Sequence, residues 1–215
     1  SAERSDCGAT LCCAQFSKCA RAFIRNGGRV SDISREVVHG WLERFQRVLQ
    51  RRAHAEGRRV RDFACTIAAA VIADDCGIFV QVGDGAIVIS PPDEPSEYCW
   101  VFWPERGEYE NTTSFLSDPA AVDQFAFECR EQCYDEIALF TDGLQRIALN
   151  VRDQTAHSPF FRPMFEPLRS ARAADNDRLN DDLLRFLGAP RVNDLIDDDR
   201  TLILATRRSS LGMRS

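Results

Sequence analysis

The chain has 215 residues, of which 44% are hydrophobic and 28% are charged, and its formal net charge is −6. A chain of this length buries roughly 70% of the surface that its unfolded form exposes, so it can form a core without disulfides or structural metals. The negative charge argues against nucleic acid as the main partner, because phosphate backbones select basic surfaces.

Two amphipathic helices are predicted at the start of the chain. The first is expected to be capped by Ser5 or Asp6 and to end at residues 27–28, and the second to run from about Ser34 to Gly57. Apolar residues recur at helical spacing in both, namely Cys12, Phe16, Cys19 and Phe23 in the first and Val38, Trp41, Leu42, Phe45 and Leu49 in the second. Their charged outer faces predict that both helices cover one side of a sheet.

Short apolar runs then predict strands over residues 63–73, 77–82, 86–90, 98–103, 124–128, 136–141 and 201–206. Turn signals at residues 74–75 and 83–85 predict an antiparallel meander. The Arg/Asp-rich residues 150–190 contain helical stretches near 160–173 and 178–187, with a helix start near Asp181 and Asp182. We expect residues 150–190 to be a variable, mobile segment that influences substrate choice. No repeat or linker divides the chain, so one domain is expected over residues 1–215.

The nine cysteines favour a reducing compartment. Their number is odd, they form no CxxC pair, and Cys65, Cys76 and Cys99 lie in apolar stretches, so we expect reduced and mostly buried thiols. There is no signal peptide and no run of about 18 apolar residues. The sequence therefore predicts a cytoplasmic protein that does not bind a membrane.

Three aspartates at the ends of predicted strands are the candidates for chemistry. Asp142 follows the strand over residues 136–141, Asp198 precedes the strand over residues 201–206, and Asp84 lies in a break between two strands. Carboxylates fixed at strand ends suit a hard cation such as Mg²⁺ or Mn²⁺. Taken singly, each aspartate is also explained by a turn in which it bonds its own backbone.

Four motifs occur in a fixed order along the chain: ACTIAAAVI, VGDGAIVI, IALFTDGL and DDRTLILA. In this order they resemble the protein phosphatase 2C family over nearly the whole chain, and residues 109–116 (YENTTSFL) resemble its bacterial branch. The resemblance implies an α+β fold, an α-β-β-α sandwich of two mainly antiparallel sheets flanked by helices. It also implies that Asp142 and Asp198 bind metal and that Asp84 holds a third, weaker ion.

The function implied by this resemblance is hydrolysis of phosphoserine or phosphothreonine in proteins. Two Mn²⁺ or Mg²⁺ ions would activate a water, so no phosphoenzyme is needed. The implied partner is a phosphoprotein, either a Ser/Thr kinase or its target. The alternative is a non-catalytic phosphatase-like domain that binds a phosphoprotein or kinase. A third interpretation, a small domain with coincidental acidic turns, would be favoured if Asp142 and Asp198 lay far apart.

Two departures from the family pattern bear on metal binding. The family's bridging aspartate lies in an Asp-Gly-x-Gly motif before the first helix, and residues 1–4 look like those that follow this motif. We therefore expect the chain to be truncated at its N-terminus relative to the family. Arg146 stands where the family often has a further aspartate, which should weaken a third site. At most one weakly bound Mn²⁺ or Mg²⁺ is expected in this chain, with little activity.

Overall fold

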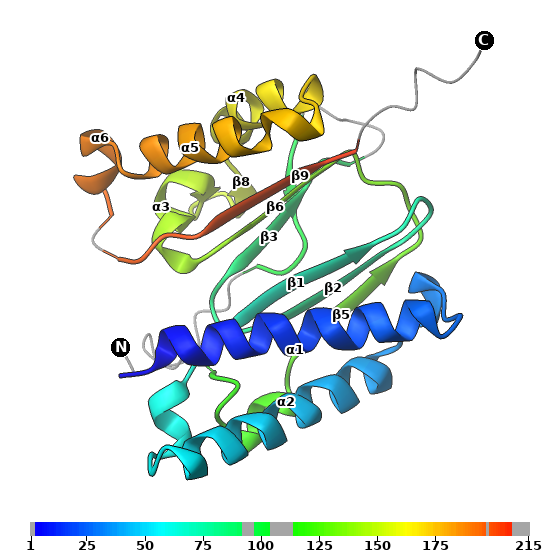
Figure 1. Cartoon of the computed structure of the whole chain (residues 1–215). Coiled ribbons are helices and arrows are strands. Elements are labelled where there is room, and N and C mark those ends of the chain that lie inside the picture. The colour runs from blue at the N-terminus through cyan, green and yellow to red at the C-terminus, as the bar shows by residue number, and fades with distance from the viewer. Residues whose placement is uncertain (1–2, 92–96, 104–113, 197, 208–215) are drawn as a thin grey trace. The chain divides into compact units, whose positions relative to one another are not determined.

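The computed structural model describes residues 3–91, 97–103, 114–196 and 198–207 (Figure 1). Its helices are α1 (Ser5–Arg25), α2 (Arg35–Ala55), α3 (Gln145–Ala148), α4 (Ser158–Arg169), α5 (Asn176–Leu187) and α6 (Pro190–Asn193). Its strands are β1 (Ile67–Ile72), β2 (Gly77–Val82), β3 (Ala86–Ile89), β4 (Cys99–Trp100), β5 (Ala126–Arg130), β6 (Glu136–Phe140), β7 (Leu149–Asn150), β8 (Thr155–Ala156) and β9 (Leu202–Thr206).

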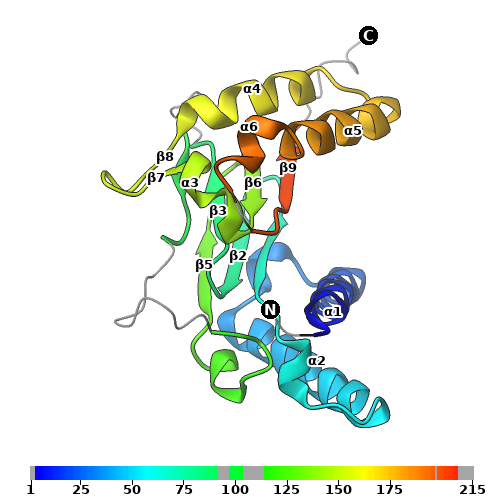
Figure 2. The same ribbon diagram turned by 90° about the vertical axis from the view of Figure 1, so that its left-hand side faces the viewer.

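The chain divides into two compact units. The first unit comprises Ser1–Gly85 and Pro104–Cys133, and the second comprises Ala86–Trp103 and Tyr134–Ser215. Each unit contains one main antiparallel sheet and its own helices (Figure 2). The α+β class predicted from the sequence is confirmed, whereas the single domain over residues 1–215 stays a prediction.

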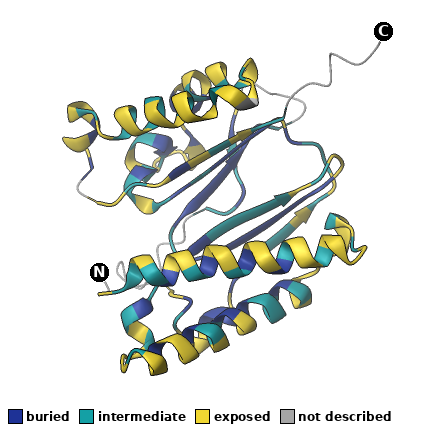
Figure 3. Cartoon of the chain, in the orientation of Figure 1, coloured by how far each residue is buried: buried dark blue, intermediate teal, exposed yellow. Residues whose placement is uncertain are grey.

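In the first unit, α1 and α2 run side by side over the sheet formed by β1, β2 and β5. Most residues of the predicted apolar stripes are buried, as the blue positions along both helices show (Figure 3), whereas Phe23 and Trp41 are half-buried. The start of α2 at Ser34 is confirmed, since the Ser34 hydroxyl accepts the Val37 N–H. The predicted cap of α1 is wrong, because Ser5 is already helical and Arg4 precedes it without a capping side-chain bond.

The sheet of the first unit has the order β1-β2-β5, with antiparallel pairing throughout. β2 is buried along its whole length and matches the predicted residues 77–82. The predicted meander is wrong beyond β2, because β3 pairs with β4 and β6 in the sheet of the second unit. Gly83 has φ of 95° between β2 and β3, a backbone conformation that favours glycine and allows the chain to leave the first sheet.

In the second unit, the sheet order is β4-β3-β6-β9 and all pairs are antiparallel. α4 contributes Phe160, Phe161 and Phe165 to the buried core. These aromatic side chains pack α4 into the core, while the mobility and the influence on substrate choice expected of residues 150–190 stay predictions. Asp181 and Asp182 lie inside α5, not at its start.

A buried carboxylate connects α4 to the sheet of the second unit. Glu136 on β6 is 4% exposed and accepts hydrogen bonds from the Tyr98 hydroxyl at 2.5 Å and from Arg169 Nε at 2.6 Å. Burial raises the pKa of Tyr98, and the hydrogen bond to Glu136 raises it further. The end of α4 is thereby held against β6 by a charged contact in addition to its aromatic packing.

Two sequence predictions concern compartment. Across the described ranges, no helix is both long and apolar enough to cross a membrane. All nine cysteines have free thiols. Four of them are buried, three are half-buried, and Cys13 and Cys129 are exposed, so the expectation that most are buried is met only in part.

Candidate metal centre

Asp142 lies two residues after the end of β6, in the 3₁₀ turn Asp142–Leu144. Its Oδ1 accepts the Gly143 N–H at 3.0 Å, and the buried side chain of Leu144 anchors the turn in the core. A Cβ atom at position 143 would lie 2.6 Å from the Asp199 carbonyl oxygen. Glycine is therefore required after Asp142 because another backbone segment passes close to it.

Asp198 lies just before β9, in a loop that other side chains hold in place. Its Oδ1 accepts the Asp199 N–H at 2.8 Å. The Arg200 side chain, two residues further along the same loop, donates to the Leu187 carbonyl at 2.6 Å and to Asn193 Oδ1 at 2.7 Å. The loop that carries Asp198 is thus fixed at the end of α5 and on α6.

Thr141 joins the two strand ends that carry these aspartates. Its hydroxyl donates to the Asp199 carbonyl at 3.2 Å and accepts the Thr201 N–H at 3.0 Å. Its own N–H donates to the Thr201 carbonyl at 3.2 Å, which extends the pairing of Phe140 with Leu202. The C-terminal end of β6 and the N-terminal end of β9 therefore meet at one end of the sheet, which we call the β6–β9 edge. Asp142 and Asp198 lie in the two loops next to it.

Asp84 belongs to the first unit, and its position there is explained by the glycine before it. A Cβ atom at Gly83 would lie 2.2 Å from Thr66 Cγ2, the side chain of the threonine in the ACTIAAAVI motif. The Gly83 carbonyl accepts a hydrogen bond from Gln81 Nε2 at 3.3 Å. The Gly-Asp motif thus fixes a sharp exit from β2. The grouping of Asp84 with Asp142 and Asp198 stays a prediction.

The donor set at the β6–β9 edge suits a divalent cation. Asp142 and Asp198 are hard oxygen ligands, and a carboxylate has about four lone-pair positions, so it can accept a backbone N–H and also bind a cation. Among the residues that the structure describes, no group of three or more His, Cys, Asp or Glu side chains could hold a metal ion. The hydrogen-bonded loops disfavour the interpretation of coincidental, widely separated acidic turns. Metal binding itself stays a prediction.

Sequence reasoning missed the residues that support this edge. Thr141 joins the two strand ends, and Arg200 fixes the Asp198 loop to the end of α5 and to α6. A threonine between an apolar strand and Asp-Gly is a signal that could have been used. Arg146 is exposed on α3. Residues 109–113 of the motif YENTTSFL lie outside the described residues.

A comparison with protein families identifies the class of protein. The family model described as protein phosphatase 2C matches residues 1–188. The chain therefore belongs to the protein phosphatase 2C family, as the ordered motifs predicted. The match includes Asp84 and Asp142 but ends before Asp198, so the assignment of Asp198 rests on the DDRTLILA motif and on its place at the β6–β9 edge.

One curated relative is similar over much of the chain. Serine/threonine-protein phosphatase 3 of Escherichia coli (strain K12) is 39% identical over 153 residues, which are 71% of this chain and 59% of that protein. The chain thus spans 59% of the length of this relative.

Two solved structures resemble the fold. The catalytic domain of the serine/threonine protein phosphatase PstP, in complex with 2 manganese ions, has a TM-score of 0.55 at 13% identity and covers 93% of this chain and 79% of that one. A bacterial serine phosphatase with an arginine-to-lysine substitution has a TM-score of 0.50 at 14% identity and covers 81% and 70%. At these identities the likeness concerns the fold alone.

Proposed function

We propose that this chain is the metal-dependent domain of a protein phosphatase that hydrolyses phosphoserine or phosphothreonine in phosphoproteins. The observation that carries the proposal is the Thr141 contact, which brings two aspartates from separate motifs to one edge of a sheet. Membership of the protein phosphatase 2C family supports the reaction class. We propose that the substrate is a Ser/Thr kinase or a target of such a kinase.

In this proposal the chain's own residues bind and orient the metal site. Asp142 and Asp198 are ligands of Mn²⁺ or Mg²⁺, and Asp84 is the residue that would hold the third, weaker ion of an intact family member. When bound, the metal supplies an activated water and stabilises the charge that develops on phosphorus. Thr141 acts as a positioning residue that sets the separation of the two loops. With two carboxylates at the edge, residues 1–215 bind at most one ion, weakly, because Mg²⁺ or Mn²⁺ then keeps several water ligands.

Calorimetric titration with Mn²⁺ tests the ligand assignment. Asp142→Asn keeps the shape of the side chain but removes its charge, so we expect the affinity for Mn²⁺ to fall by at least about a hundredfold, more than loss of an outer-shell partner would cause. Asp181→Asn, which neutralises an exposed aspartate on α5, is the matched control and should leave the affinity unchanged. Unchanged Mn²⁺ binding in Asp142→Asn would show that the assignment is wrong.

Activity is measured on a phosphothreonine peptide and on an aryl phosphate, with Mn²⁺ present. The assay uses both the 215-residue chain and the product of the whole open reading frame that encodes it. We expect little turnover by the 215-residue chain, and Mn²⁺-dependent turnover by the whole product that Asp142→Asn abolishes. Tight phosphopeptide binding by the whole product without any turnover would instead support a non-catalytic binding domain.

A further inference from the structure

Two buried cysteines lie against each other where α1 packs on the segment that leads into β1. Cys12 lies on α1, and Cys65 lies two residues before β1. Their exposed fractions are 1% and 6%, and both belong to the core of the first unit. The two thiols are hydrogen-bonded to each other.

The path of the backbone explains why these two side chains meet. Just before α1, the Arg4 N–H donates to the Asp62 carbonyl at 2.9 Å. One turn further along, a Cβ atom at Gly8 would lie 2.1 Å from the Phe63 carbonyl oxygen. The helix and the segment after residue 62 therefore run side by side in the same direction. Cys12 lies one turn beyond Gly8 on the same face of the helix, beside the residues that follow Phe63.

A second pair of neighbouring cysteines lacks this geometry. Cys76 immediately precedes β2, and Cys129 lies on β5 opposite Ile78. The two cysteines are thus diagonal neighbours across the strand pair, a relation in which the residues are about 7–8 Å apart. A disulfide spans such a separation only if the backbone moves. The sheet register therefore disfavours a bond between Cys76 and Cys129.

The hydrogen bond between Cys12 and Cys65 makes the two thiols chemically unequal. The Cys12 thiol donates it, which lowers the pKa of Cys65 despite burial. The same hydrogen bond, together with burial, raises the pKa of Cys12. Because the thiolate is the reactive form of cysteine, Cys65 is the thiol that reacts first and Cys12 is the thiol that follows.

We propose that Cys12 and Cys65 form a modification site that a hydroperoxide converts to a disulfide, tying α1 to the start of β1. The Cys65 thiolate attacks one peroxide oxygen, the O–O bond breaks, and the leaving hydroxide takes up the proton that Cys65 released. Cys12 then attacks the sulfenic sulfur of Cys65, the S–O bond breaks, and the hydroxide leaves with the Cys12 proton as water. Two thiols are oxidised while hydrogen peroxide is reduced to two waters. This site does not depend on the proposed phosphatase function.

The start of α1 gives the oxidant access to this site and is the part that the disulfide changes. Arg4 precedes the helix without a capping side-chain bond. Uncapped helix ends open more readily than capped ones, and such opening admits a molecule as small as hydrogen peroxide. The disulfide closes a loop of some fifty residues and opposes this opening. In a reducing compartment such a bond is transient, which suits a redox-sensing site.

The test treats the fully reduced chain with hydrogen peroxide and locates the oxidised residues by peptide mass spectrometry. We expect a bond between Cys12 and Cys65, seen as the loss of two hydrogen atoms from the linked peptides and reversed by dithiothreitol. Amide hydrogen exchange over the first half of α1 should become slower in the oxidised chain and return to its initial rate after reduction.

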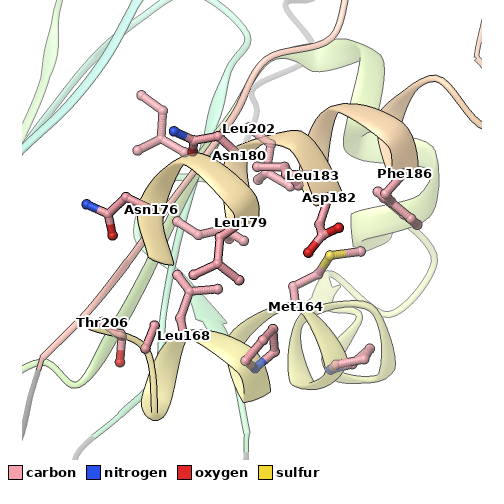
Figure 4. A pocket seen from close by; sticks show the side chains of 15 residues that line it. Met164, Leu168, Asn176, Leu179, Asn180, Asp182, Leu183, Phe186, Leu202 and Thr206 are labelled. Atoms are coloured by element: carbon pink, nitrogen blue, oxygen red, sulfur yellow. The ribbon is translucent and has the colours of Figure 1, made fainter. Parts of the chain in front are cut away.

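Met164 is a competing site of oxidation in the second unit. It lines a cleft of about 520 Å³ between α4, α5 and β9 (Figure 4). Peroxide adds an oxygen atom to methionine, so this product differs in mass from a disulfide. Met164→Leu removes the competing product and leaves the first unit unchanged, so the disulfide should form in this variant as it does in the wild type.

Three serine variants test the pairing and the order of reaction. Cys12→Ser keeps a hydroxyl that can donate to Cys65, so peroxide should leave Cys65 as a sulfenic acid that dimedone labels. Cys65→Ser should leave Cys12 unlabelled. Cys13→Ser changes an exposed neighbour on α1 and is the matched control, which should form the disulfide as the wild type does.

Circular dichroism of each variant confirms that it is folded, and the mapping of the wild-type chain decides the question if a variant fails to fold. The proposal would be overturned if Cys12 and Cys65 stayed reduced while the exposed thiols Cys13 and Cys129 were oxidised. A bond between Cys76 and Cys129 in place of the expected one, or loss of the disulfide in Cys13→Ser, would equally overturn it.

Discussion

Replacement of Arg169 by leucine is expected to lower the free energy of unfolding of the second unit by about 2 kcal/mol. Arg169 donates to both oxygens of Glu136, at 2.6 Å from Nε and 3.2 Å from Nη2. Breaking a fully buried ion pair costs about 3–5 kcal/mol, because one charge is left buried without a partner. Glu136 is buried, but the Arg169 side chain is 50% exposed and solvent screens the pair, which lowers the estimate.

Urea denaturation measures this change. A Trp41→Phe background confines the tryptophan signal to Trp100 and Trp103, both in the second unit. The matched control is Arg185→Leu on α5, whose ion pair with Asp182 is also 2.6 Å long but whose side chain is 75% exposed. This control should cost less than about 1 kcal/mol.

A second substitution separates lost charge balance from lost packing. Glu136→Gln, added to Arg169→Leu, replaces the buried carboxylate by a neutral amide that needs no counter-charge and can still accept from Tyr98. We expect the double variant to recover more than half of the lost stability. If Glu136→Gln gave no recovery, or if Arg169→Leu cost no more than the Arg185→Leu control, the argument from an uncompensated buried carboxylate would be refuted.

Two further predictions rest on single contacts. Folding raises the pKa of Tyr98 above its ordinary value of 10.0, so the folded state holds this proton more tightly; the resulting stabilisation of the fold is complete below pH 10.0 and is lost as the pH rises beyond it. Tyr98→Phe should flatten this loss of stability at alkaline pH, measured by thermal unfolding. An unchanged pH profile would contradict the prediction. Gly143→Ala should weaken Mn²⁺ binding about tenfold in calorimetry, because the new Cβ displaces the Asp199 carbonyl and with it the loop of Asp198. An affinity equal to that of the wild type would show that the close approach of Gly143 to Asp199 does not determine the position of the Asp198 loop.

The sequence alone determined the elements whose signals are local. The amphipathic spacing of α1 and α2 predicted which faces are buried, and the apolar run Gly77–Val82 predicted β2 to the residue. The ordered motifs predicted the family, which the family model confirms. These predictions succeeded because helix period, strand composition and turn residues depend on neighbours within a few positions of the chain.

Only the tertiary structure decided which distant segments meet. β2 and β3 are consecutive apolar strands, yet they pair in different sheets, and no local pattern records that choice. The junction of Asp142 and Asp198 depends on Thr141 hydrogen-bonding to residues some sixty positions away. The ion pair between Glu136 and Arg169 could not be predicted from the sequence either. Glu136 is the first residue of β6, and it is buried only because α4 packs against it. Burial and pairing of this kind arise from the packing of remote elements, whereas the sequence pattern reports local preference.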